Sequence, residues 1–387
     1  MNNRITKLMF TGWRNAFPLV SLFVLFFFGF SAYGEPYMAV RTGLKCVVCH
    51  VNASGGGKRT DFGVQYGHYK LKMKSIRPSK KPAFFGGQIS EMLSVGANLR
   101  VDNATSLDYQ PTDPITGLDT LPKVLGDNKT NIKEADLYFQ MDLIQDFVLF
   151  YADADMMQNG WREYWTMMKF PLNSYVKIGY MLLPYGLRLY DDDAFIRAKT
   201  GYTYFTRDMA GEIGFEPGPF SLIANLTDAR FSTVATVVYR RWRVGGSFQR
   251  WTEDHPGLEG TNFWGDDYRW GVFAGTNFGK FTLMGEGDII TKENRDQFAG
   301  FLELNYHIMD GLNYKTTYEF FDRNTTIMGN EAGLAWNRDG QDRLTVGVEA
   351  FVTQFTELAL FYRMNRFIPQ AQFENQDQVI LRFVGFF

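Results

Sequence analysis

The chain has 387 residues, 17% of them aromatic, with 38 glycines and a formal net charge of −2. This length suffices for one large domain or for two ordinary ones. After the first 34 residues no run of 18 apolar residues occurs, which excludes a membrane-spanning helix from the rest of the sequence.

The N-terminal residues have the pattern of a secretory signal peptide. Basic residues precede an apolar run from Phe17 to Phe30, and small residues follow at Ala32 and Gly34. A transmembrane anchor is the alternative, but the apolar run is short for one. We therefore expect residues 1–34 to be removed before Glu35 and the mature chain to be exported.

Charge divides the remaining chain into a small basic unit and a large acidic one. Residues 35–83 carry a net charge of +8, whereas residues 84–387 carry −13. The sequence RPSKKP, at 77–82, has the prolines and polar residues of a linker. We expect one unit over 35–83 and a second over 84–387.

From residue 84 onward, apolar and polar residues alternate with a period of two, and turn residues separate the alternating segments. In residues 135–143, leucine, phenylalanine and methionine share one face, while aspartate, tyrosine and glutamine share the other. The pattern predicts sixteen strands near 87–102, 132–143, 146–156, 161–170, 174–182, 208–216, 219–226, 232–241, 242–251, 267–277, 279–291, 297–308, 311–323, 342–353, 355–366 and 377–387.

The predicted strands are joined alternately by tight turns and by long connections. The long connections are 103–131, 157–160, 183–207, 227–231, 252–266, 292–296, 324–341 and 367–376. A membrane β-barrel needs strands of about ten residues with an apolar outer face, and it has short periplasmic turns and longer external loops. A soluble β-sandwich would instead have apolar inner faces. We predict an all-β transmembrane fold, a 16-stranded antiparallel outer-membrane β-barrel with a small N-terminal plug domain, and with both barrel ends in the periplasm.

Acidic residues are frequent in the rows that are predicted to face the barrel lumen. Two interpretations stay open: a solvated polar lumen, or an acidic wall that holds the basic N-terminal unit and attracts cations. These residues are Asp136, Asp142, Asp153, Asp155, Glu286, Asp288 and Glu303.

The only two cysteines of the chain lie in the sequence CVVCH, residues 46–50. The C-x-x-C-H pattern is typical of c-type haem attachment. Two thiols one helical turn apart can each form a thioether with one porphyrin, and His50 then serves as the proximal iron ligand. A disulfide is an alternative in an exported protein, and a zinc site is another that would lack a fourth ligand. We predict one covalent haem c held by Cys46, Cys49 and His50.

The second iron ligand is expected among residues near the motif. His68, Met38 and Met73 are the candidates, and His68 is preferred because imidazole is a strong iron ligand. A surface histidine in a basic segment is the alternative interpretation of His68.

A glycine-rich stretch follows the motif. Gly55–Gly57 would let the backbone turn closely past a porphyrin, and Lys58 or Arg59 could pair with a haem propionate. The alternative is a flexible loop. A phosphate-binding loop is not favoured, because the required spacing is absent.

The order of signal peptide, haem motif and barrel resembles the fused monohaem c-type cytochrome–porin family, which includes outer-membrane iron oxidases. The resemblance rests on RTGLKCVVCH at 41–50, on Phe62-Gly63 and on Tyr69-Lys70-Leu71, and it covers essentially the whole mature chain. The insert Gly55–Gly57 departs from the iron-oxidase pattern and looks more like barrel proteins of metal-reducing bacteria.

This resemblance implies an outer-membrane electron conduit with Fe(II):cytochrome c oxidoreductase-type activity. The implied partners are a periplasmic c-type cytochrome, extracellular Fe(II) or a surface multihaem cytochrome, and outer-membrane lipid; no nucleic-acid partner is expected. Two alternatives stay open. The barrel could be a diffusion porin or cation channel whose haem unit is a gate or sensor, or a scaffold for separate multihaem cytochromes.

Overall fold

The computed structural model describes residues 35–73, 86–108, 124–157, 160–204, 206–253, 265–292, 295–322, 340–367 and 376–386. The predicted signal peptide at 1–34, the predicted linker at 77–82 and the terminal Phe387 lie outside these ranges. Those parts of the sequence analysis stay predictions.

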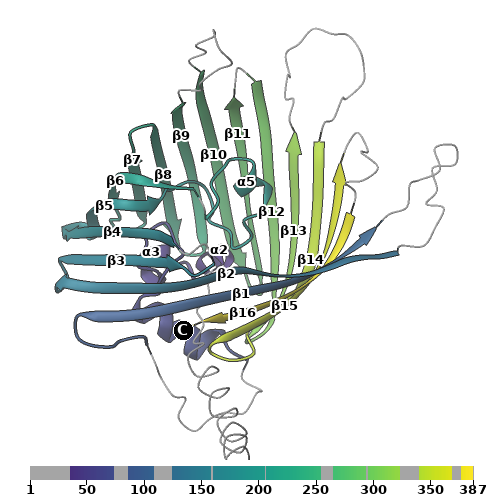
Figure 1. Ribbon diagram of the computed structural model, residues 1–387, viewed down its shortest axis with the longest axis horizontal. Helices are drawn as coiled ribbons and strands as arrows, with labels where there is room; N and C mark the ends of the chain where they lie inside the picture. Colours follow the sequence, from purple (N-terminus) through teal and green to yellow (C-terminus); the bar gives the residue numbers. More distant parts are fainter. Residues whose placement is uncertain are drawn as a thin grey trace, which may run out of the picture.

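Sixteen antiparallel strands within the described ranges form one closed barrel (Figure 1). Each strand pairs with its neighbours in sequence, and β1 closes the sheet by pairing with β16. The strands are β1 (Leu93–Asp108), β2 (Val124–Ile144), β3 (Val148–Asp155), β4 (Gly160–Phe170), β5 (Ser174–Leu182), β6 (Arg207–Phe215), β7 (Phe220–Leu226), β8 (Arg230–Tyr239), β9 (Trp242–Glu253), β10 (Gly265–Phe278), β11 (Phe281–Lys292), β12 (Arg295–Met309), β13 (Leu312–Asp322), β14 (Gly340–Ala350), β15 (Thr356–Phe367) and β16 (Gln376–Phe386). The predicted 16-stranded antiparallel barrel is confirmed, and every predicted strand overlaps its counterpart.

The connections that the sequence predicted to be tight turns all lie at one end of the barrel, and the β7–β8 and β11–β12 connections at the other end are also short. Gly279 and Gly311 occupy two of these turns with positive φ angles of 60° and 81°, a conformation that glycine adopts without a steric penalty. The first residue of β1 and the last residue of β16 lie at this same end. We call it the short-turn end.

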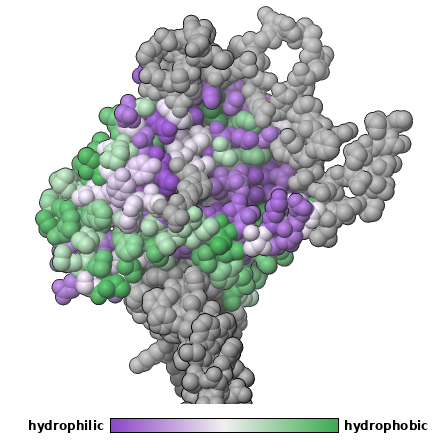
Figure 2. Space-filling model, in the orientation of Figure 1, coloured by the Kyte–Doolittle hydropathy of each residue, from purple (hydrophilic) through white to green (hydrophobic). Residues whose placement is uncertain are grey.

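Side chains along the strands alternate between the outside and the lumen. In β12, Leu302 is 49% exposed on the outside, whereas its neighbours Glu303 and Asn305 are buried in the lumen. Figure 2 shows hydrophobic residues gathered on the outer flank at the left, where β3 to β6 lie. The alternation that predicted the strands therefore also separates an apolar outer face from a polar inner one.

The N-terminal segment, residues 35–73, packs against the inner face of the barrel (Figure 1). It forms α2 (Pro36–Thr42), α3 (Cys46–Cys49), α4 (Asp61–Tyr66) and the π-helical turn η1 (Gly67–Leu71). Arg41 donates a hydrogen bond to Asn313 of β13 at 3.0 Å, and Lys45 pairs with Glu216 at 3.2 Å. No helix in the described ranges is long and apolar enough to cross a membrane.

A second segment enters the lumen from the opposite end of the barrel. The connection 183–207 was expected to form a long external loop, and that expectation was wrong. Its described residues before β6, 183–204 and 206, are largely buried, and they include α5 (Phe195–Ala198), which contacts β11, β12 and β13. Leu187 and Phe195 donate backbone N–H groups to Glu286 and Glu319, both at 2.6 Å. Buried luminal carboxylates thus hold this segment, which we call the inward segment, inside the barrel.

Several luminal acidic residues pair with cations of the wall itself. Arg162 of β4 lies 2.9 Å from Asp136 and 2.6 Å from Asp153, with all three side chains almost fully buried. Buried carboxylates are tolerated when an ion pair and hydrogen bonds neutralise them. The interpretation of the lumen as an acidic wall that attracts the basic segment is therefore incomplete, because some of the acidic residues are already paired with cations of the wall.

Loss of the Arg162 side chain should destabilise the barrel strongly. Arg162→Met leaves Asp136 and Asp153 buried without this cation, which we expect to cost about 3–5 kcal/mol. The measurement is the midpoint temperature of thermal unfolding in detergent. Unfolding is monitored by the loss of the β-sheet circular dichroism signal. Lys129→Met is the matched control, because the Lys129–Asp127 pair is exposed. Equal effects of the two substitutions would contradict this interpretation.

Candidate functional site

A cavity of about 1210 Å³, which we call the cysteine cavity, lies between the two segments that occupy the lumen. The N-terminal segment contributes Cys46, Cys49 and His50 to its lining, and the inward segment contributes residues 185–188. Barrel side chains such as Phe273 of β10 complete the wall. The lining combines apolar side chains with a few polar and charged groups, as ligand pockets generally do.

The backbone around the cysteines is held by local hydrogen bonds. Cys46 to Cys49 form the single helical turn α3, and the His50 N–H donates to the Cys46 carbonyl at 2.9 Å. His50 pairs with Arg59 in an isolated β-bridge, which closes the intervening stretch into a loop. Gly55–Gly57 turn within this loop with φ angles of 90°, 78° and 65°. The glycines are therefore required by backbone geometry beside Cys46.

Gly43 fixes where this segment meets the barrel. It ends α2 in the left-handed conformation, with φ of 70°. A Cβ at this position would clash with the carbonyl oxygen of Arg240, in the turn between β8 and β9. Only glycine, which lacks a Cβ, lets the backbone of the N-terminal segment approach the Arg240 carbonyl this closely.

The chemistry of the motif residues fits a covalently attached haem. Both cysteines are free thiols in partly exposed positions that line the cavity. His50 is 5% exposed, and its Nδ1 has no hydrogen-bond partner in the described part of the chain. Burial, with a smaller effect of the Arg59 charge, lowers the pKa of His50 to about 3, so the imidazole is neutral at physiological pH. A neutral imidazole is the form that ligates iron.

The two basic residues predicted to contact haem propionates lie in different places. Arg59 lines the cavity. Lys58 is outside the lining, and its Nζ lies 3.2 Å from the Arg59 carbonyl and 3.4 Å from Gln140 of β2. Burial lowers the pKa of Lys58 to about 8.

Two further arginines line the cavity, and the sequence analysis missed both. Arg188, in the inward segment, donates to the Gly55 carbonyl at 2.6 Å. Arg243, in β9, donates to the Leu44 carbonyl at 2.9 Å and lies 3.5 Å from the Cys46 sulfur. Neither belongs to a local motif. The apolar residues Leu187 and Leu189 on either side of Arg188 were a signal that its segment is buried.

The candidates for a second iron ligand are also separated. Met38 of α2 lines the cavity. His68 is buried in η1 outside that lining, with its ring 5.0 Å from the Phe355 ring in an edge-on arrangement. Met73 donates its N–H to the carbonyl of Phe351. The role of His68 stays a prediction.

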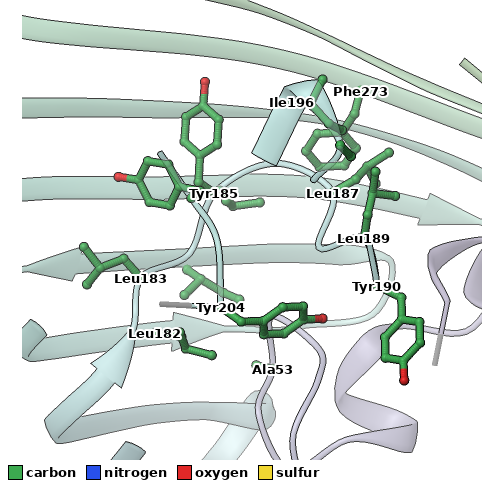
Figure 3. Close-up of a cluster of buried hydrophobic side chains, with 14 of the residues drawn as sticks. Ala53, Leu182, Leu183, Tyr185, Leu187, Leu189, Tyr190, Ile196, Tyr204 and Phe273 are labelled. Carbon is green, nitrogen blue, oxygen red and sulfur yellow. The ribbon is translucent and has the colours of Figure 1, made fainter. Parts of the chain in front are cut away.

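Apolar side chains of the inward segment pack around the part of the cavity that this segment lines. Figure 3 shows Leu187 and Leu189 near Ile196 and Phe273, and Tyr204 above Ala53 of the N-terminal segment. Tyr185 stacks on Tyr202 with ring centroids 4.5 Å apart, and its hydroxyl lies 3.0 Å from Asp288. These contacts join the two luminal segments and the wall into one buried cluster.

The fold is that of the outer-membrane porins. OmpT of Vibrio cholerae matches with a TM-score of 0.54 and 12% identity, over 78% of this chain and 99% of that one. OmpF of Salmonella typhi, in complex with daunomycin, matches with 0.56 and 10%, over 76% and 97%. The anion-selective porin of Comamonas acidovorans matches with 0.52 and 12%, over 76% and 99%. No family model and no curated protein matches the sequence.

Substitution of Gly43 should release the N-terminal segment and leave the barrel intact. Gly43→Ala adds the clash with Arg240 and about 1–3 kcal/mol of backbone strain. We expect faster tryptic cleavage within residues 35–73, with unchanged thermal unfolding of the barrel. Gly211→Ala is the control, because a Cβ there meets nothing within 4 Å. Equal cleavage rates in the two variants would show that Gly43 does not set the docking.

Proposed function

We propose that this chain is an outer-membrane protein that holds one c-type haem inside its barrel and passes electrons across the membrane through it. The observation that carries the proposal is the convergence of Cys46, Cys49 and His50 on one luminal cavity. The porin fold and the apolar outer face support placement in the outer membrane. When bound, a haem supplies a one-electron Fe(III)/Fe(II) couple.

The residues of the cavity have separate tasks in this proposal. Cys46 and Cys49 would hold the porphyrin through thioethers, and His50 would ligate the iron. Leu187, Phe273 and their apolar neighbours exclude water, which also shields the couple from solvent. Arg59, Arg188 and Arg243 bring positive charge to the lining, which suits the two propionates.

The position of the cavity supports transfer between the two sides of the membrane. The hydrocarbon core is about 30 Å thick, and electron tunnelling falls steeply with distance. A redox group inside the lumen is nearer to the far side of the membrane than one bound at the opposite surface. We propose a periplasmic c-type cytochrome as one partner, and extracellular Fe(II) or a surface multihaem cytochrome as the other.

A diffusion channel gated by the haem unit is the second candidate. It is favoured by the porin fold and by two further cavities, of about 440 and 1200 Å³, that share Asp191, Arg363 and Arg382. Glu35 lines both the 440 Å³ cavity and the cysteine cavity. These cavities form a series along the lumen.

The haem proposal is tested by the absorption spectrum of the purified protein. We expect a reduced-minus-oxidised spectrum of c-type haem and a haem that stays attached after denaturation. Cys46→Ala and Cys49→Ala should each weaken the covalent attachment, whereas Ser54→Ala, which also lines the cavity, should leave it unchanged. A protein that matures without haem would overturn the proposal.

Electron transfer and solute diffusion are separated in liposomes and planar bilayers. The conduit predicts that external Fe(II), or a reduced multihaem cytochrome, reduces cytochrome c enclosed in the liposomes. It also predicts single-channel conductance far below that of an open 16-stranded porin. A large conductance that disappears on haem reduction would favour the gated channel instead.

The residue that would supply a second ligand to a haem iron is tested by a pair of substitutions. Since Met38 lines the cavity and His68 does not, we expect Met38→Ala to convert the iron from low-spin to partly high-spin. His68→Ala should leave the spin state unchanged. The reverse result would show that η1 moves toward the haem in the loaded protein and would restore the prediction made from the sequence.

A further inference from the structure

Glu35 begins the N-terminal segment and is buried inside the barrel near its short-turn end. Its Oε1 lies 3.0 Å from the Nζ of Lys315 in β13. The same Nζ lies 3.4 Å from Glu303 of β12 and 3.3 Å from Glu349 of β14. We call these four residues the Glu35 cluster.

The Glu35 cluster contains more negative than positive charge. Three carboxylates surround the single ammonium of Lys315, and Glu357 adds another buried carboxyl group nearby. The guanidinium of Arg382 is paired elsewhere, because it makes two hydrogen bonds of 2.9 Å to Asp102. Buried charge that is not neutralised is costly, so the cluster favours a further cation.

Three carboxylate oxygens of the cluster also lack hydrogen-bond donors. In the described part of the chain, Oε2 of Glu35 and both side-chain oxygens of Glu303 are buried and have no hydrogen-bond partner, and Oε2 of Glu303 lies 3.4 Å from the Lys315 Nζ. Both residues line the 440 Å³ cavity. A ligand that suits them is small, positively charged and rich in N–H donors, which describes a primary ammonium group.

The sequence itself supplies such a group at this position. The signal-peptide pattern predicts cleavage between Gly34 and Glu35. Hydrolysis of that peptide bond consumes one water and leaves a carboxylate on Gly34 and an α-ammonium group on Glu35. Before cleavage the same nitrogen is a neutral amide that cannot balance the carboxylates.

We propose that the Glu35 cluster binds the α-ammonium group of the mature chain, so that removal of the signal peptide locks the N-terminal segment into the barrel. The ammonium has three N–H donors, and Glu35 and Glu303 together offer three oxygens without donors. Tyr37, which donates to Glu349 at 2.9 Å, anchors α2 to the same cluster. The inference concerns maturation and does not depend on haem.

Chemical labelling of the mature amine tests the proposal. The protein is purified from outer membranes, its first residue is determined by intact mass, and its amines are dimethylated at neutral pH with mass-spectrometric readout. We expect the chain to begin at Glu35 and its α-amine to react roughly tenfold more slowly in the folded than in the denatured protein. Glu303→Gln and Glu349→Gln should each reduce this protection.

Matched variants separate the proposal from a general loss of structure. Glu286→Gln changes another buried luminal glutamate and should leave the protection unchanged. If the glutamine variants fail to fold, one alanine inserted before Glu35 displaces the amine by about 3.5 Å without changing the barrel. That insertion should speed tryptic cleavage within residues 35–73. A different first residue, equal labelling in folded and denatured protein, or an insertion without effect would each overturn the proposal.

Discussion

Strand β1 hydrogen-bonds to β2 on one side and to β16 on the other, so the sheet has no free edge. Every other feature of the molecule depends on this closure. It satisfies the backbone polar groups without help from solvent, which lets the outer side chains be apolar and allows contact with lipid. It also encloses a lumen, and the side chains that point into this lumen are largely shielded from bulk water. Polar groups placed there must find partners within the protein.

The two luminal segments follow from this need for partners. Glu286 and Glu319 accept backbone N–H groups from residues 183–206, and Tyr37 supplies a hydroxyl to Glu349. The segments in turn are too small to form cores of their own, and the barrel wall completes their burial. The cysteine cavity lies where the two segments meet. The barrel is thus both the scaffold and most of the packing partner of the candidate haem site.

Properties that are local in sequence could be predicted, and those set by contacts between distant residues could not. The period of two identified all sixteen strands, because side chains in a closed sheet must alternate between two media. The CVVCH motif placed Cys46, Cys49 and His50 together, because five residues around one helical turn cannot separate. Arg188 and Arg243 lie more than a hundred residues away and reach the cavity only through the fold. Lys58 and Arg59 are adjacent, yet only Arg59 faces the cavity.

The conduit and the gated channel impose different demands on the lumen. A solute pathway needs continuous water-filled space, whereas electrons cross packed protein and need only short gaps between redox groups. Buried tyrosines and leucines of the inward segment pack beside the cysteine cavity. Such packing obstructs solutes and leaves electron tunnelling possible. The charged cavities beside Asp191 and Arg382 are a described region that could admit small ions. In the proposed conduit, electrons would therefore pass through the cysteine cavity, whereas small ions would pass through the charged cavities.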